Sequence, residues 1–422
     1  MELNNQNLVA TGFDGATNMS GSNAGLCTLI KQNMSPKSIY VHCYCHKLNL
    51  ALESACQKIP AFQESIETAK TLYAYCEGSA KRHHLFQHIQ DKATKTTLKK
   101  LCETRWHHRY ASFKAIKTSY TALLTFLSIQ DDDLITKCGA TASGLFKKIK
   151  KFQFIFYLEI LFRCFKAVNI LSETLQSIDM DIVKAQEMYQ VTHNELVNMK
   201  FEFSEFYVDI TTIAESSHVD ILETTSHKRR RTIEGISTGD NKSRYNELHD
   251  EIVDTFLSKI DERFTEDNIQ PVIAIYKMLV GYERVGTDFK DLEMYAKDVD
   301  FEALDMELTT WYTFKKIHPA QFDTRKVSEL SKQFVNCHLQ ETLPQLFKFF
   351  KIYLSIPVTS TTGERTFSCL PKLKNYMRNT TEQQRLSHLV VLSIESRQME
   401  NVACESIVDE FAAAKNGRVK FY

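Results

Sequence analysis

From Pro60 onward, apolar residues recur three and four positions apart over most of the chain, which is the spacing of one face of an α-helix. Pro60 can occupy the first position of a helix, and Gly78 is expected to end that helix. With 13 Gly and 7 Pro in 422 residues, the chain holds few residues that would interrupt such elements. The pattern predicts further long helices over residues 110–130, 141–178, 181–216 and 245–264.

Two short runs before Pro60 have the composition of β-strands, at residues 7–12 and 38–42, and each is followed by a helical pattern. The predicted fold class is therefore α+β, mostly α. Between residues 216 and 246 the composition shifts to Ser, Thr, Gly and charged residues around His227–Arg231. This segment is predicted to be an exposed, mobile basic loop, and its basic run is a candidate nuclear localisation signal.

The overall charge and composition exclude several classes of protein. Lys and Arg together number 52, as do Asp and Glu, so affinity for nucleic acid must come from local patches. Eleven Cys without a compact scaffold pattern indicate reduced thiols in a cytosolic or nuclear protein. The most apolar run, residues 152–165, is too short for a membrane span and contains two charges, so no membrane partner is expected.

Two stretches near opposite ends of the chain each place one carboxylate among small residues. The first is Gly12-Phe13-Asp14-Gly15-Ala16-Thr17-Asn18-Met19-Ser20-Gly21, and the second is Ser360-Thr361-Thr362-Gly363-Glu364-Arg365-Thr366-Phe367-Ser368. The second follows a dense apolar helix and Ile356-Pro357, and it precedes an Arg-Leu pair in an apolar helix. Together they resemble the hAT transposase superfamily, and the first is similar to the zinc finger MYM-type and TTF-type hAT-derived proteins.

That resemblance implies an RNase H-like catalytic domain, in which Asp14 and Glu364 correspond to the second and third of three metal-binding carboxylates. In an intact relative they would hold Mg²⁺ or Mn²⁺ for phosphodiester cleavage and strand transfer. The 350 residues between them (364 − 14) leave room for the helical insertion of this family. Without the resemblance, the favoured interpretation of Glu364 is a capping-box residue three positions after Thr361.

The first acid of the trio has no counterpart among the thirteen residues that precede Asp14. We therefore expect a truncated RNase H-like core, vestigial carboxylates at Asp14 and Glu364, and no bound cofactor. The expected function is that of a domesticated or degenerate transposase-like protein that dimerises, associates with nucleic acid and lacks catalysis. The alternative is an active DDE-type transposase or nuclease, represented by an N-terminally incomplete chain.

A short Cys- and His-rich run follows the second predicted strand. In His42-Cys43-Tyr44-Cys45-His46, Cys43 and His46 resemble the Cys-x-x-His signature of the family, which would place His46 near the scissile phosphate. Structural zinc usually needs a second ligand pair after a longer loop, and no second pair with convincing spacing follows. A half-buried Cys and a His at the rim of the site are favoured over a zinc centre.

The segment from Lys81 to Arg109 is the most basic part of the N-terminal region, with eight Lys or Arg, five His and two acids. Its Arg105-Trp106 pair resembles an Arg-Trp element of the family, where a Trp can stack on an unpaired base. We predict nucleic-acid contacts at Arg105, Trp106, Lys99 and Lys100. The alternatives are a buried core Trp and a solvated helix face.

The C-terminal resemblance also implies self-association. The predicted interface residues are Phe367, Leu386, Leu389 and Val390, with the chain itself as partner and DNA as a further one. The expected location is the nucleus or, failing that, the cytoplasm. The predicted domains are a partial catalytic-type region (1–109), a helical insertion (110–340), a dimerisation region that completes the RNase H-like core (341–400) and a tail (401–422).

Overall fold

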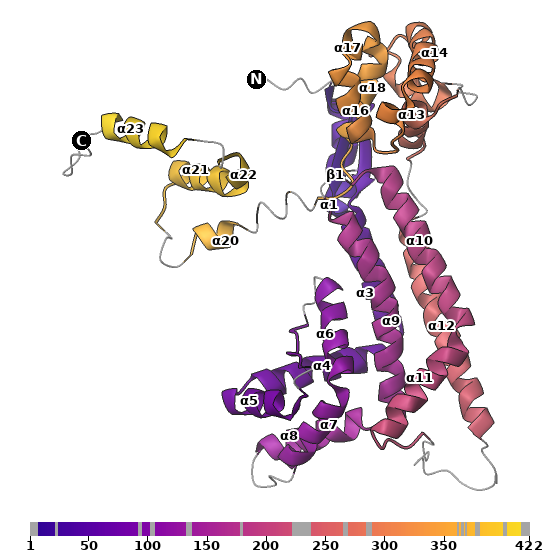
Figure 1. The fold of residues 1–422 in the computed structure, drawn as a ribbon, viewed down its shortest axis with the longest axis vertical. Coiled ribbons are helices and arrows are strands. Elements are labelled where there is room, and N and C mark those ends of the chain that lie inside the picture. The colour runs from indigo at the N-terminus through magenta and orange to yellow at the C-terminus, as the bar shows by residue number, and fades with distance from the viewer. Residues whose placement is uncertain are drawn as a thin grey trace. The chain divides into compact units, whose positions relative to one another are not determined.

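The computed structural model describes residues 7–21, 24–91, 95–101, 106–131, 137–177, 180–221, 238–264, 269–283, 289–360, 363, 367, 369–375, 380–399 and 403–414. The described residues are mostly helical, which confirms the predicted fold class at that level (Figure 1). The chain divides into two compact units, residues 1–359 and residues 360–422. The predicted boundaries at 109/110 and 340/341 stay predictions.

A small parallel sheet forms from the two predicted strands. β1 (Ala10–Phe13) pairs with β2 (Ile39–His42) in a register that matches Ala10 with Ile39 and Phe13 with His42. Between them the chain passes through α1 (Thr17–Ser20) and α2 (Leu26–Asn33). Because the strands are parallel, both end at the same edge of the sheet, and the residues after Phe13 and His42 meet there.

The next three helices follow β2 in close succession. α3 (Tyr44–Lys58) follows β2 directly, α4 (Pro60–Glu77) has Pro60 in its first turn, and α5 (Ala80–Ile89) follows. The N–H of Gly78 donates to the Ala74 carbonyl at 3.0 Å and ends α4. The predicted stop at Gly78 is therefore confirmed.

Seven helices make up the next part of unit 1. They are α6 (Trp106–Thr118), α7 (Tyr120–Asp131), α8 (Lys137–Ile149), α9 (Phe152–Leu175), α10 (Ile182–Phe201), α11 (Phe203–Ser216) and α12 (Thr238–Phe264).

Three of the long helices predicted from sequence are each two helices in the structure. The prediction over 110–130 misses the break between α6, which ends at Thr118, and α7, which begins at Tyr120. The prediction over 141–178 misses the break at Lys151, whose backbone is extended (φ −128°, ψ 141°). The Tyr120 hydroxyl donates to the Ile149 carbonyl at 2.7 Å and occupies an acceptor at the end of α8. The prediction over 181–216 misses the break at Glu202. Apolar residues keep their helical spacing through the corners at Lys151 and Glu202, so periodicity alone could not show these two breaks.

The core of unit 1 runs along α9, which is buried through most of its length. α9 packs against α6 and α10, and α12 packs between α3 and α10 (Figure 1). The Phe264 ring at the end of α12 stacks on Tyr189 of α10 at 5.0 Å and meets Tyr44 of α3 edge-on at 5.5 Å. The helices that follow the sheet are thus joined to the long helices through aromatic contacts.

A third group of helices completes unit 1. It comprises α13 (Gln270–Val280), the 3₁₀ helix η2 (Phe289–Tyr295), α14 (Phe301–Ile317), α15 (Pro319–Phe322), α16 (Val327–Asn336), α17 (Leu339–Thr342) and α18 (Pro344–Leu354). Trp311 of α14 is fully buried, in edge contacts with Phe322, Phe334 and Phe350. The predicted apolar helix before Ile356 is confirmed as α18.

Unit 2 contains α20 (Leu370–Leu373), α21 (Gln383–Ile394), α22 (Ser396–Met399) and α23 (Cys404–Ala414). The apolar helix predicted around the Arg-Leu pair is confirmed as α21, which contains Arg385 and Leu386. Glu382 itself occupies the N-cap position, and its side chain makes no capping hydrogen bond. A helix also forms at 404–414, within the predicted tail.

Within the described residues, no helix combines the length and the apolar character that crossing a membrane requires.

Candidate functional site

Asp14 lies in the turn that leaves β1 at the edge of the sheet. Its side chain is exposed, and Oδ1 accepts a hydrogen bond from the Ala16 N–H at 3.2 Å. Gly15 follows with φ +79°, a conformation that side chains rarely adopt. The chain therefore turns sharply directly after the carboxylate, as expected for the Asp-Gly pair in the sequence.

His42 occupies the neighbouring strand end and packs under this turn. A Cβ atom added at Gly15 would lie 2.3 Å from Cε1 of His42, so the ring fills the space that Gly15 leaves open. The His46 ring, one helical turn into α3, lies 5.9 Å from the His42 ring and is half-buried. The structure thus gathers the Asp14 turn, His42 and His46 at one edge of the sheet. His42 was not among the site residues predicted from the sequence, although the two strands that each precede a helix could have indicated it.

Replacing Gly15 with Ala is expected to lower the free energy of unfolding by about 1–3 kcal/mol, because the methyl group meets the His42 ring and φ is positive. Urea unfolding followed by circular dichroism measures the change. The matched control is Gly144→Ala in α8, where the added Cβ meets nothing within 4 Å. That change is expected to raise stability by up to about 1 kcal/mol, since Ala favours a helix over Gly. Equal effects of both substitutions would contradict the packing described for Gly15.

The residues that precede the C-terminal signature reach the same strands. A Cβ at Gly12 would lie 2.9 Å from Cγ of Pro357, and the Tyr44 N–H donates to the Val358 carbonyl at 3.2 Å. The stretch that leads to Glu364 therefore packs against β1 and the start of α3, although 345 residues (357 − 12) separate Gly12 from Pro357. Glu364 itself lies outside the described residues.

The described residues do not fit a divalent metal site. No group of three or more His, Cys, Asp and Glu among them could hold a metal ion. Cys43 is buried at the N-cap of α3, and its N–H donates to the Phe13 carbonyl at 2.8 Å, which favours a structural role. The roles predicted for Asp14, Glu364 and His46 stay predictions, and no chemical step is derived through a metal ion.

The predicted nucleic-acid contacts fall on a segment of which only part is described. Lys99 and Lys100 are exposed between the buried side chains of Leu98 and Leu101. Arg105 and the Trp106 side chain lie outside the described residues. The nearby Arg82 is engaged locally, because its Nε donates to the Tyr75 carbonyl at 2.6 Å. Lys99 and Lys100 are thus available to a partner.

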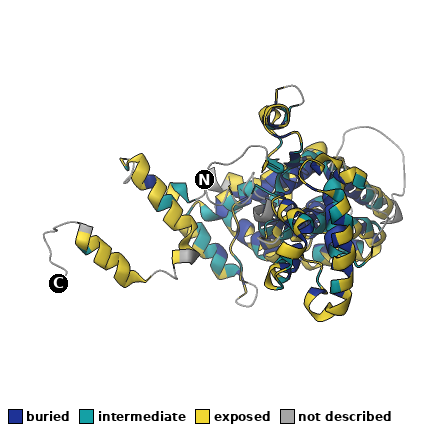
Figure 2. Cartoon of the chain, turned by 90° about the horizontal axis from the view of Figure 1, so that it is seen from above, coloured by how far each residue is buried: buried dark blue, intermediate teal, exposed yellow. Residues whose placement is uncertain are grey.

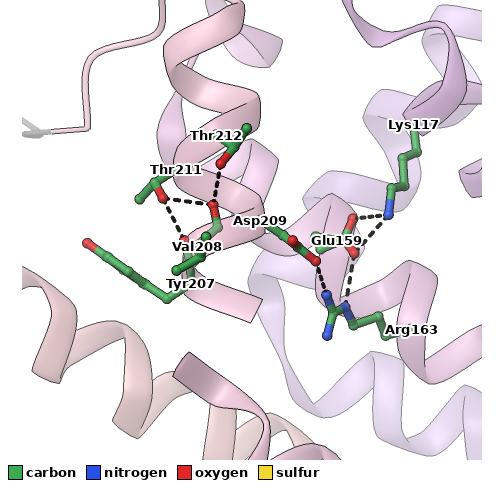
Figure 3. A network of polar contacts seen from close by, with 8 residues as sticks. All are labelled: Lys117, Glu159, Arg163, Tyr207, Val208, Asp209, Thr211 and Thr212. Carbon is green, nitrogen blue, oxygen red and sulfur yellow. Dashed lines mark hydrogen bonds and ion pairs between the residues drawn. The ribbon is translucent and has the colours of Figure 1, made fainter. Parts of the chain in front are cut away.

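A second polar site lies between α6, α9 and α11. The buried carboxylate of Glu159 contacts Lys117 at 2.6 Å and Arg163 at 3.0 Å, and Arg163 also contacts Asp209 at 2.5 Å (Figure 3). A groove of about 500 Å³ lies beside this network. The network links three helices through paired charges, so we assign its residues a structural role in stabilising the packing of these helices.

Comparison with known proteins supports the lineage at a coarse level. Residues 292–397 match the family model of the hAT family C-terminal dimerisation region. Over 327 residues the chain is 24% identical to the 52 kDa repressor of the inhibitor of the protein kinase from Mus musculus, and over 326 residues it is 23% identical to the protein of that name from Homo sapiens. Each match covers 74% of this chain and 42% of the relative, so the chain spans less than half the length of these curated relatives.

Proposed function

We propose that this protein is a transposase-derived, nucleic-acid-associated protein that works as a homodimer held together by its C-terminal unit. The observation that carries the proposal is the match of residues 292–397 to a dimerisation region. Under this proposal the sheet edge at Asp14 is the remnant of an RNase H-like core, and the predicted nuclear location fits a protein that associates with DNA.

Exposed apolar side chains on α21 and α23 support a role in association. On α21, Val391, Leu392 and Ile394 are 57%, 46% and 38% exposed. On α23, Ile407, Val408 and Phe411 are 47%, 44% and 66% exposed, and their spacing places them on one helical face. The helices leading to the C-terminus are accordingly mostly yellow in Figure 2. Contiguous apolar surface of this kind is costly in water and is typical of an interface.

The four residues predicted for dimerisation differ in exposure. Phe367 is 70% exposed and available to a partner, whereas Leu386 is 8% exposed. Leu389 and Val390 are half-buried. The proposed interface is therefore centred on Phe367 and the exposed side of α21 rather than on Leu386.

Val391→Lys is expected to convert the dimer into a monomer of 48.8 kDa, because a charge buried at the centre of an apolar interface finds no partner. Light scattering after size-exclusion chromatography measures the mass at micromolar concentration. The control is Ser393→Lys, which adds the same charge at an exposed polar position of the same helix and is expected to leave the dimer intact. A wild-type chain that is strictly monomeric at this concentration would refute the proposed function.

The alternative, an active DDE-type transposase, needs Asp14, Glu364 and a third carboxylate around divalent metal. The described residues assemble no such group. Cleavage of duplex ends in Mg²⁺ or Mn²⁺ that disappears in Asp14→Ala would favour this alternative.

A further inference from the structure

The corner between α8 and α9 carries four exposed lysines within five residues. Lys147 and Lys148 belong to the last turn of α8, and Lys150 and Lys151 form the connection to α9. Ile149 between them and Phe152 after them are fully buried. These two anchors hold the backbone of the corner in the core while all four lysine side chains are exposed, with the Lys150 ammonium 5.2 Å from the centre of the Phe146 ring.

Two further cations lie on the neighbouring start of α12. The Phe152 ring meets Tyr207 of α11 at 6.2 Å and Tyr245 of α12 at 5.1 Å. The Lys242 ammonium lies 5.5 Å from the centre of the same Tyr207 ring, and Arg244 is exposed beside Tyr245. The α8–α9 connection and the start of α12 thus meet at one aromatic cluster through Phe152, Tyr207 and Tyr245. We call the six cationic residues on these segments the basic corner: Lys147, Lys148, Lys150, Lys151, Lys242 and Arg244.

Acidic residues near the basic corner offset only part of this charge. Glu64 of α4 contacts Lys148 at 3.7 Å, with both side chains more than half exposed, so this pair is weak. Glu205 lies in the first turn of α11. Within the described part of the chain, Lys147, Lys150 and Lys151 form no ion pair. Positive charge in the last turn of a helix stabilises its C-terminus, which accounts for Lys147 and Lys148 in α8. Lys150 and Lys151 lie beyond the end of α8, so this effect does not account for them.

We propose that the basic corner binds the phosphate backbone of nucleic acid. This inference rests on the nucleic-acid association proposed above and names a surface for it that is separate from Lys99 and Lys100. A polyanion requires only accessible positive charge, which the corner supplies. A protein interface or a membrane surface would also require exposed apolar side chains, whereas Ile149, Phe152 and Tyr245 at this corner are buried and Tyr207 is partly buried. The uncapped N-terminus of α9 adds a favourable dipole for phosphate.

The test compares the full chain with the triple variant Lys147→Gln/Lys150→Gln/Lys151→Gln. Binding to a fluorescein-labelled 30-base-pair duplex of mixed sequence is measured by anisotropy between 50 and 200 mM KCl. We expect binding at least about tenfold weaker at 100 mM salt. We also expect the slope of the logarithm of the binding constant against the logarithm of the KCl concentration to become shallower by about 2–3, because each lost phosphate contact removes about 0.9 from this slope. The control, Lys297→Gln/Lys316→Gln/Lys332→Gln, removes the same charge from exposed positions of unit 1 and is expected to bind like wild type.

Each other outcome overturns the inference in a distinguishable way. Equal loss in both triple variants would mean that net charge alone drives binding. Unchanged binding in the corner variant would leave nucleic-acid association intact and exclude this surface. Absence of binding by the wild-type chain would refute the association as well. Binding to phosphatidylserine vesicles, lost in the corner variant, without binding to the duplex would assign the corner to membranes. The mass of the corner variant is measured in parallel, and a dimer shows that dimerisation is independent of this surface.

Discussion

Replacing Glu159 with Ala is expected to lower the free energy of unfolding by about 3 kcal/mol, among the largest effects of any single substitution in this chain. Its side chain is 2% exposed and contacts both Lys117 and Arg163. Removing one member of a buried ion pair leaves the remaining charge poorly solvated, which costs more than the pair contributes. Lys117 and Arg163 are 32% and 22% exposed, so water compensates for part of the loss.

Chemical unfolding monitored by circular dichroism measures this change, and Asp209→Ala serves as the matched control. Asp209 contacts the same Arg163 but is 56% exposed, so its removal is expected to cost less than about 1 kcal/mol. If both substitutions lower the free energy of unfolding by the same amount, burial of the Glu159 carboxylate does not account for the stability that the network contributes. Because the network joins α6 to α9 and α11, Glu159→Ala is also expected to increase hydrogen exchange in α6.

Lys315→Met is expected to destabilise the protein by about 2 kcal/mol at pH 8.5, and by much less at pH 7. Lys315 is fully buried, and its side-chain nitrogen Nζ donates to the carbonyls of Leu279, Val280 and Gly281 at the end of α13. It also lies 5.0 Å from the Trp311 ring centre. Methionine fills similar space but leaves these carbonyls without their donor.

The pH dependence follows from the effect of burial on the Lys315 side chain. Burial lowers its pKa from 10.5 to about 7. Between these values the unfolded chain binds a proton that the folded protein does not, so the stability of the wild type rises with pH. From pH 7 to 8.5 the wild type should gain about 1.5 kcal/mol over the variant. Other titrating groups, such as the buried Cys thiols, are present in both proteins, so their contributions cancel in the difference between the two free energies of unfolding.

The exposed neighbour Lys316 supplies the control for this experiment. Its side chain is 56% exposed, and its 3.9 Å contact with Glu283 is at the surface. Lys316→Met is expected to change stability by less than about 0.5 kcal/mol, with no dependence on pH over this range. A stability difference between wild type and Lys315→Met that is constant from pH 7 to 8.5 would contradict the described burial.

Several boundaries in this fold could be predicted because the responsible residues act locally. Pro60 begins α4 and Gly78 ends it through backbone geometry that needs no distant partner. The two strands were recognised from their β-branched and apolar composition, and their parallel pairing could be inferred from the intervening helices. The corner at Lys151 was missed because its apolar neighbours continue the helical spacing on both sides.

For the candidate site, the sequence supplied the lineage motifs and the Asp-Gly turn, but not the neighbours of that turn. The His42 ring beneath Gly15 depends on the register of β1 against β2. The burial of Lys315 was equally hidden, since a lysine in a helical pattern is usually solvated.

The sequence by itself determined the start and the end of α4, the mostly helical class and the resemblance at both ends of the chain, because propensity and capping act within a few residues. Tertiary structure alone decided that Pro357 packs on Gly12, that the titratable side chains of Glu159 and Lys315 are buried, and that the lysines of the α8–α9 corner lie near cations of α12. Those features depend on contacts between residues far apart in the chain, and their energies arise from desolvation and packing that no local pattern encodes.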